Sequence, residues 1–224
     1  MNIRSTIHTL LAATALATVS VAAVAASRHA ERRVTIEYKD LSGTQDLSSA
    51  PFVSHTAGFH LFEIGEPATL LVQELAENGN PEFILGTAVG DSKTFLDEAV
   101  GLPNLPGQGR RVVLRVDAEH PLVSGGWMLG HTNDGFAGID SVDAYHLTRK
   151  TVIEVYALDA GTEKDTETKA DVAALGGLGR IPANGVIARH AGIRGDRDIP
   201  ASFKFDPGLP IGRVTITPIG AAGS

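Results

Sequence analysis

Three segments alternate apolar and polar residues with the two-residue period of a half-buried β-strand. They are residues 33–38, 111–117 and 213–217, and in the first of them Val34 and Ile36 share one face. A strand with one apolar and one polar face is typical of antiparallel sheet, because parallel sheets are usually covered on both faces. The pattern therefore predicts an antiparallel sheet with one face in water.

Further strands are expected where apolar runs are bounded by Gly, Pro, Asn or Asp, at residues 122–129, 151–158 and 185–190. One short helix is predicted over residues 67–77, because a proline suits its first turn and apolar residues recur every three to four positions before Asn-Gly. Many strands, one helix and abundant turn residues predict an all-β protein, an antiparallel β-sandwich. Residues 160–182 lack periodicity and are expected to form a long loop, which is often functional.

The first 26 residues have the character of a signal peptide. Arg4 precedes an uncharged run, residues 5–27, and small residues near its end offer a cleavage site. An uncleaved membrane anchor is the alternative, but Ala and Thr make the run only weakly apolar. We expect a secreted or periplasmic protein with no stable membrane insertion after cleavage, whose residues 27–224 form a single domain.

Charge and cysteine content narrow the classes of partner. Removing residues 1–26 takes away only Arg4 and leaves 18 basic against 26 acidic side chains, a balance that disfavours nucleic acid and anionic membranes. The chain has no cysteine, so no disulfide stabilises it. An acidic surface is compatible with cation binding, although acidic residues often serve only to keep a protein soluble.

Oxygen-bearing side chains concentrate in two segments that are expected to be loops, residues 133–140 and 159–163. If the strands before them are neighbours, Asp134, Asp159 and Glu163 meet at one edge, where their charges repel unless a cation compensates them. Six to eight oxygens in a tolerant geometry suit calcium better than magnesium. Spacing alone leaves two interpretations open: a hard-cation site, or two ordinary turns with exposed acids.

Other chemistry finds less support in the sequence. No pair of histidines has a recognised metal-ligand spacing, and most of them are expected in turns or at the surface. His131, three residues before Asp134, is a candidate to orient that carboxylate. Ser124 lacks the Gly-x-Ser-x-Gly elbow of many serine hydrolases, and the glycines after it are expected to serve a bulge before Trp127, itself expected in the core.

Five segments in order resemble the spondin domain. They read FHLFEIGEPA at residues 59–68, LAENG at 75–79, NDGFAGID at 133–140, DAGTE at 159–163 and IGRVTI at 211–216. The resemblance covers most of residues 33–219, and the glycine that follows the first aspartate is the form associated with prokaryotic, single-domain members.

The resemblance implies a C2-like β-sandwich that binds calcium. Family ligands map onto Asp134, Asp159 and Glu163, the last with Glu replacing Asp, which keeps the charge but lengthens the side chain. It also implies a secreted recognition or adhesion-type module without catalysis, whose partner is an unidentified extracellular protein or glycan. A secreted hydrolase using acidic residues near the same loops, and a metal-free structural envelope protein, remain alternatives.

Overall fold

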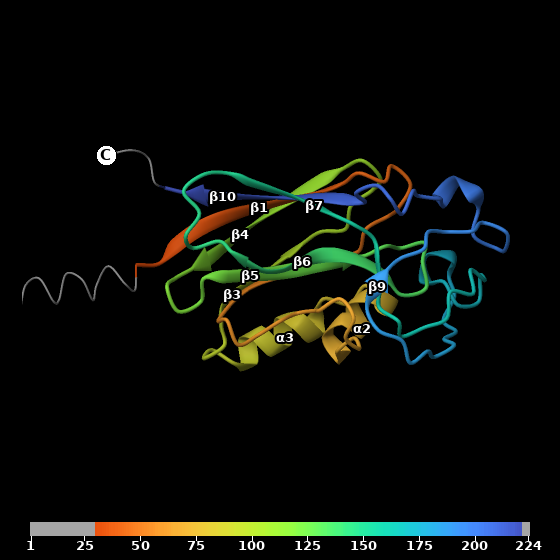
Figure 1. The fold of residues 1–224 in the computed structure, drawn as a ribbon, viewed down its shortest axis with the longest axis horizontal. Helices are drawn as coiled ribbons and strands as arrows, with labels where there is room; N and C mark the ends of the chain where they lie inside the picture. Colours follow the sequence, from red (N-terminus) through yellow and green to blue (C-terminus); the bar gives the residue numbers. More distant parts are fainter. Residues whose placement is uncertain (1–29, 221–224) are drawn as a thin grey trace, which may run out of the picture.

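The computed structural model describes residues 30–220, which fold into two antiparallel sheets packed face to face (Figure 1). The predicted signal peptide lies outside the described residues. One sheet has four strands in the order β4-β1-β10-β7, and the other has six in the order β3-β2-β5-β6-β8-β9. The four-stranded sheet comprises β1 (Arg32–Asp40), β4 (Gly109–Val116), β7 (Thr151–Val155) and β10 (Gly212–Ile219). The six-stranded sheet comprises β2 (Ala50–His55), β3 (Phe95–Gly101), β5 (Leu122–Met128), β6 (Gly135–Asp143), β8 (Leu158–Asp159) and β9 (Ala188–Arg189).

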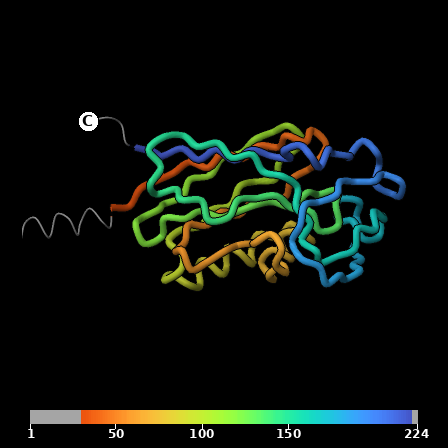
Figure 2. The backbone as a smooth tube through the Cα atoms, in the orientation of Figure 1, coloured from red at the N-terminus to blue at the C-terminus, as the bar shows by residue number. Residues whose placement is uncertain are grey.

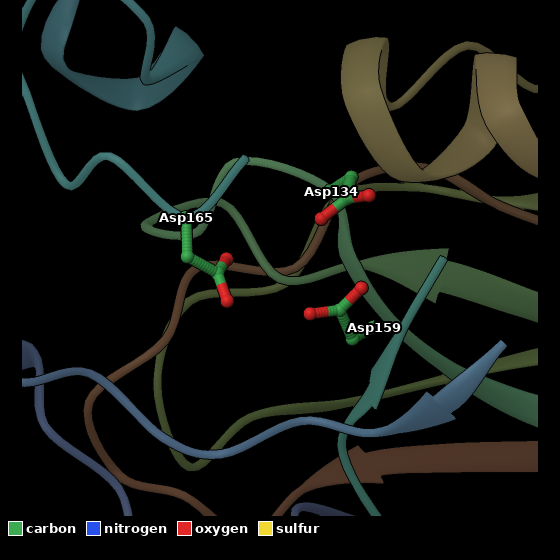
Figure 3. Close-up of side chains that lie close together, drawn as sticks. All are labelled: Asp134, Asp159 and Asp165. Atoms are coloured by element: carbon green, nitrogen blue, oxygen red, sulfur yellow. The ribbon is translucent and has the colours of Figure 1, made fainter. Parts of the chain in front are cut away.

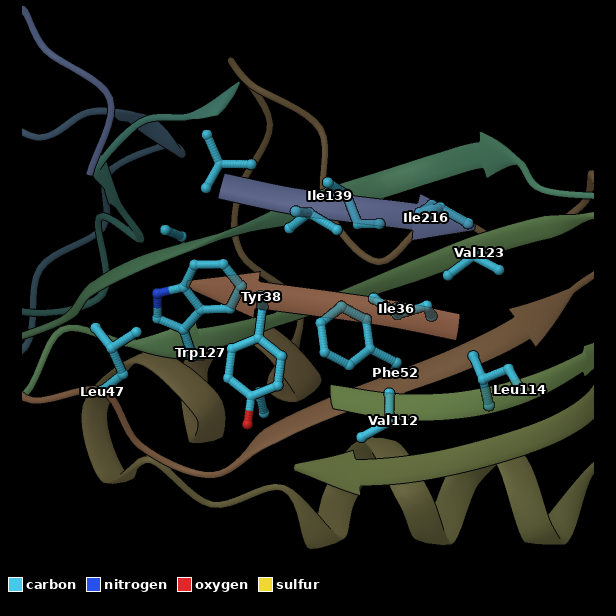
Figure 4. Close-up of a cluster of buried hydrophobic side chains, with 14 of the residues drawn as sticks. Ile36, Tyr38, Leu47, Phe52, Val112, Leu114, Val123, Trp127, Ile139 and Ile216 are labelled. Carbon is cyan, nitrogen blue, oxygen red and sulfur yellow. The ribbon is translucent and has the colours of Figure 1, made fainter. Parts of the chain in front are cut away.

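The prediction of an all-β antiparallel sandwich is confirmed. Strands β1, β4 and β10 lie where alternation placed them, and Val34, Ile36 and Tyr38 are at most 1% exposed. The apolar faces of the two sheets meet in the main core, where Trp127 stacks on Tyr38 with ring centroids 5.4 Å apart (Figure 4). Trp127 is therefore a core residue, as expected.

The described residues contain two α-helices instead of the one predicted: α2 (Leu70–Asn78) and α3 (Glu82–Gly90). Thr69 caps the start of α2, and Gly79 ends it in a left-handed conformation, with its N–H donating to Leu75 O over 3.0 Å. The sequence did not predict α3, because its residues are apolar all round and include two glycines. Within residues 30–220, no helix has the length and apolar character needed to cross a bilayer.

Both helices cover the outer face of the six-stranded sheet and form a second apolar cluster there (Figures 1 and 2). This cluster includes Val53 of β2, Leu75 of α2, Ile84 of α3 and Phe136 of β6. The six-stranded sheet is thus buried on both faces, which explains why all six residues of β2 are buried and show no alternation.

Two segments differ from their predicted form. In one the chain passes from one sheet to the other, and in the other a strand begins inside the expected loop. The strand expected over residues 151–158 is divided, since β7 belongs to the four-stranded sheet and β8 to the other. Residues 133–140 were expected to be a loop, but β6 begins at Gly135 and pairs with β5. The register between β5 and β6 shifts between Val123 and Gly125, which confirms the predicted bulge.

The long loop predicted at residues 160–182 belongs to a larger irregular region at one end of the sandwich, with short 3-10 helices at Ala173–Leu175 and Ala201–Phe203 (Figure 1). A small cluster of Val172, Ile193 and Ile199 packs inside it. Glu167 is 4% exposed, and its carboxylate accepts hydrogen bonds from the backbone N–H groups of Arg194 and Gly195 over 2.7 and 2.8 Å. Buried contacts therefore hold this region in a defined arrangement.

Candidate metal centre

Asp134 occupies the last position before β6, at the end of a tight turn. Leu129 N–H donates to Gly135 O over 2.8 Å, and the hydroxyl of Thr132 accepts the Gly135 N–H over 2.9 Å. A β-carbon on Gly135 would lie 2.4 Å from that hydroxyl oxygen, so only glycine fits. The turn thereby sets the position from which the Asp134 side chain projects.

Asp159 reaches the same place from the neighbouring strand. Gly135 of β6 pairs with Asp159 of β8, and Ala160 N–H donates to Asp134 O over 3.1 Å. Oδ1 of Asp159 accepts the Gly161 N–H over 2.7 Å. Gly161 has a φ of +70°, and a β-carbon there would lie 2.8 Å from Val186 N and O, so a glycine is required at this turn. The antiparallel pairing thus brings the two predicted aspartates together.

Asp165 joins these two aspartates from the following loop (Figure 3). One carboxylate oxygen from each of Asp134, Asp159 and Asp165 lies within 4.8 Å of the other two. Asp134 is fully buried, whereas Asp159 and Asp165 are partly exposed. We call these three residues the acidic cluster.

The two oxygens of Asp134 have different surroundings. Oδ2 accepts three hydrogen bonds: from Thr162 N over 2.7 Å, from Thr162 Oγ1 over 3.1 Å and from Glu163 N over 2.9 Å. Oδ1 is buried without a hydrogen-bond partner. A buried carboxylate oxygen without a partner is costly, so this atom fits the position of a metal ligand.

Burial and mutual repulsion shift the pKa values of all three carboxyl groups upward. Burial and the charge of Asp159 raise the pKa of Asp134. Burial is also the main cause for the other two, and it is reinforced at Asp159 by the charge of Asp165 and at Asp165 by that of Asp134. A bound cation would compensate the repulsion and keep all three groups ionised.

Glu163, the third predicted ligand, lies beside the acidic cluster but not in it. Its backbone N–H contacts Asp134, while its carboxylate lies 3.6 Å from Nε of Arg180 and lines a cavity of about 600 Å³ next to α2. The backbone of Glu163 forms an antiparallel β-bridge with Pro182, and this pairing places its side chain beside the acidic cluster instead of in it. Burial, followed by the charges of Glu77 and Asp134, raises the pKa of Glu163 to about 7.

Two residues that face the centre were not found from the sequence. Asp165 lies in the polar loop that was expected to be functional, but no periodicity there distinguishes it from its acidic neighbours. His190 was grouped with surface histidines, yet it is 3% exposed and its Nε2 lies 3.9 Å from Oδ1 of Asp165. His131, the predicted orienting histidine, instead stacks on Phe203 with ring centroids 3.5 Å apart.

Ser124 contacts a histidine and an aspartate in the interior, but not in the order of a catalytic triad, because the aspartate contacts the serine and not the histidine. Its Oγ lies 2.8 Å from Nε2 of His55 and 3.1 Å from Oδ1 of Asp140, and it accepts the Ser141 N–H over 2.8 Å. Ser124 and His55 are both fully buried. This arrangement links β2, β5 and β6 and presents no nucleophile to solvent.

Fold and site together define an antiparallel β-sandwich with an acidic cluster among the loops at one end. Residues 38–174 match the family model described as Spondin_N, over more than half of the chain. The chain therefore belongs to the Spondin_N family, as the sequence predicted. Membership supports an extracellular recognition or adhesion-type module. No curated protein matches the chain.

Proposed function

We propose that this protein is a secreted or periplasmic recognition module in which calcium organises the loops at one end of the sandwich, without catalysis. The observation that carries the proposal is the buried, unpartnered Oδ1 of Asp134, in a carboxylate that has an oxygen within 4.8 Å of carboxylate oxygens of Asp159 and Asp165. Three oxygen donors from acidic side chains are the chemistry that calcium prefers, and loop carbonyls and water complete its six to eight ligands.

The ion would join three segments that are distant in the sequence: the turn before β6, the end of β8 and the loop that contains Asp165. Without a cation, the three carboxylates repel one another, which contributes to their raised pKa values, and this repulsion opposes the close approach of these segments. With calcium bound, the same contacts stabilise the end of the sandwich and shape a surface. We propose an extracellular protein or glycan as the partner of that surface.

The burial of Asp134 argues against the hydrolase alternative. Glycoside hydrolases hold two carboxyl groups about 5 to 9.5 Å apart, with room for the substrate and water between them. In the acidic cluster three carboxylates converge and Asp134 is fully buried, so an ion fits this space better than a sugar.

The proposal is tested by thermal unfolding of the protein with calcium, with magnesium and with a chelator. At calcium concentrations about 10 to 100 times the dissociation constant, binding stabilises the folded state by about 1.4 to 2.7 kcal/mol. For a domain of this size that is a rise in Tm of roughly 3 to 10 °C. We expect this rise in the wild type, and a smaller one with magnesium.

The double variant Asp134→Asn/Asp159→Asn should lose the calcium response. Asp143→Asn is the matched control, because Asp143 lies at the opposite end of β6 with a side chain that is 49% exposed. A wild type whose Tm is the same in calcium and in chelator contradicts the proposal. So does a double variant that responds as the wild type does.

A further inference from the structure

His190 is a buried histidine that faces the acidic cluster and that the proposed calcium site does not use as a ligand. Its backbone N–H donates to Ala157 O over 3.0 Å, and its ring lies 5.4 Å from the ring of Phe205. Only 3% of the residue is exposed. Its Nε2 has no hydrogen-bond partner, and Oδ1 of Asp165 lies 3.9 Å away.

The other ring nitrogen determines which atom carries the proton. Nδ1 of His190 accepts a hydrogen bond from the Gly192 N–H over 2.9 Å. A nitrogen that accepts a hydrogen bond carries no proton, so the proton of the neutral ring is on Nε2. The loop therefore presents an N–H donor to the carboxylates.

The same hydrogen bond opposes metal ligation by the ring. Ligation through Nε2 would move the proton of the neutral ring to Nδ1, where it would meet the N–H of Gly192. Two donors facing each other at 2.9 Å repel, so the turn at residues 190–192 would have to open.

We propose that His190 is a positioning residue of the calcium site, whose Nε2–H donates to the Asp165 carboxylate and holds it as a ligand without contacting the ion. This inference rests on the function proposed above. Closing the gap from 3.9 Å to a hydrogen bond of about 2.9 Å requires a movement of about 1 Å. An ion that draws the three carboxylates together supplies a reason for that movement.

A consequence is selectivity for hard cations. With His190 held as a donor, the acidic cluster offers oxygen ligands only, which suit calcium and magnesium, whereas zinc and copper favour imidazole nitrogen. His190 lies beyond residues 38–174, so the match to the family does not include it.

The first test reads the tautomer of His190 directly. In protein labelled with ¹⁵N at histidine, two-bond ¹H–¹⁵N correlation spectra distinguish a proton on Nε2 from one on Nδ1. We expect the Nε2–H form with chelator and with calcium, and no shift of Nε2 to a metal-bound value with zinc. An Nδ1–H form, or zinc ligation by Nε2, overturns the inference.

The second test compares His190→Leu with His190→Gln by calcium titration calorimetry. Leu removes the donor and should weaken calcium binding by about 10-fold or more, as for other groups that orient metal ligands. Gln can place an N–H at a similar reach and should bind within about threefold of the wild type. Because His190→Leu also removes the acceptor of the Gly192 N–H, its Tm in chelator is measured as well, and the titration is run well below that Tm.

The outcomes separate the two proposals. If the wild type does not bind calcium, the proposed function fails and the role of His190 fails with it. If the wild type binds calcium and His190→Leu binds it equally well, only the role of His190 fails. If Leu and Gln weaken binding equally, the N–H donor is not what matters, and the inference is again overturned.

Discussion

Glu163 and Asp134 are joined by a single backbone hydrogen bond, from Glu163 N to Oδ2 of Asp134 over 2.9 Å, while the carboxylate of Glu163 faces Arg180. The residue that the family resemblance assigned as third ligand thus supports the first ligand through its main chain. Its side chain belongs to a different group of charges, with Glu77 and Arg180. Asp165 takes the third place in the acidic cluster.

We predict that Asp165→Asn reduces calcium affinity by at least 10-fold, and that Glu163→Gln changes it by less than about threefold. Asp165 contributes an oxygen to the acidic cluster, whereas the Glu163 contact with Asp134 uses the backbone and survives the substitution. Calorimetric titration of both variants measures this. The reverse order of effects would return Glu163 to the ligand set and remove Asp165 from it.

The raised pKa of Glu163 predicts that the stability of the metal-free protein depends on pH. Its pKa is about 7 in the folded state against 4.5 for an ordinary glutamate, so the folded state binds more protons than the unfolded state between those values. Stability contributed by this group is present below pH 4.5 and is lost as the pH rises to about 7. In Glu163→Gln that loss is absent.

Urea unfolding in chelator at pH 4.5 and pH 8 measures the difference. At pH 8, Glu163→Gln should be more stable than the wild type by up to about 3 kcal/mol, since each pKa unit corresponds to about 1.4 kcal/mol. At pH 4.5 the two proteins should differ little. Equal pH profiles for the two proteins would show that Glu163 titrates normally in the folded state.

Arg180 connects the loop after the acidic cluster to helix α2. Its Nε and Nη2 donate to the Glu77 carboxylate over 2.7 and 2.9 Å, and the side chain of Glu77 is 7% exposed. Arg180→Met leaves that buried carboxylate without its guanidinium partner, and we expect a loss of about 1 to 3 kcal/mol in the free energy of unfolding.

Arg213→Met is the matched control for that variant, because Arg213 pairs with Glu154 over 3.0 Å on an exposed surface. Exposed ion pairs contribute little, so its effect should stay below about 1 kcal/mol. Both free energies come from urea unfolding at pH 7. A cost for Arg180→Met no larger than that of Arg213→Met would mean that the Glu77 contact does not stabilise the fold.

Gly138 is predicted to tolerate no side chain. A β-carbon there would lie 2.3 Å from Gly125 O and 2.9 Å from the Cα of Gly126, because β5 and β6 approach closely next to the bulge. Gly138→Ala should destabilise the protein by about 1 to 3 kcal/mol or more, through forced backbone movement. Chemical unfolding measures the change.

Gly86→Ala provides the opposite control. Gly86 lies in α3, is exposed, and has no atom within 4 Å of the added β-carbon. Alanine there should stabilise the helix by about 0.5 to 1 kcal/mol. If both alanines had the same effect, the close approach of β5 and β6 at Gly138 would not be the cause.

The sequence was sufficient where apolar and polar residues recur with a regular period. Strands β1, β4 and β10 alternate because they form a sheet covered on one side only, and α2 has a capped start and a glycine stop. Strand β2 was missed because it is covered on both sides, so burial leaves no polar face to mark a period. Helix α3 was missed for a different reason: its outer face is exposed but carries the apolar residues Phe83 and Val89, and the helix contains two glycines.

For the site, the sequence by itself showed that Asp134 and Asp159 lie in segments rich in glycine and oxygen ligands, and these segments resemble those of the spondin domain. The sequence also predicts a signal peptide, which lies outside the described residues. Only the tertiary structure decided that Asp165 and His190 lie beside those aspartates and that the carboxylate of Glu163 contacts Arg180 outside the acidic cluster. An irregular loop has no period, so the direction of each side chain depends on long-range pairing, here of Glu163 with Pro182 and of β6 with β8.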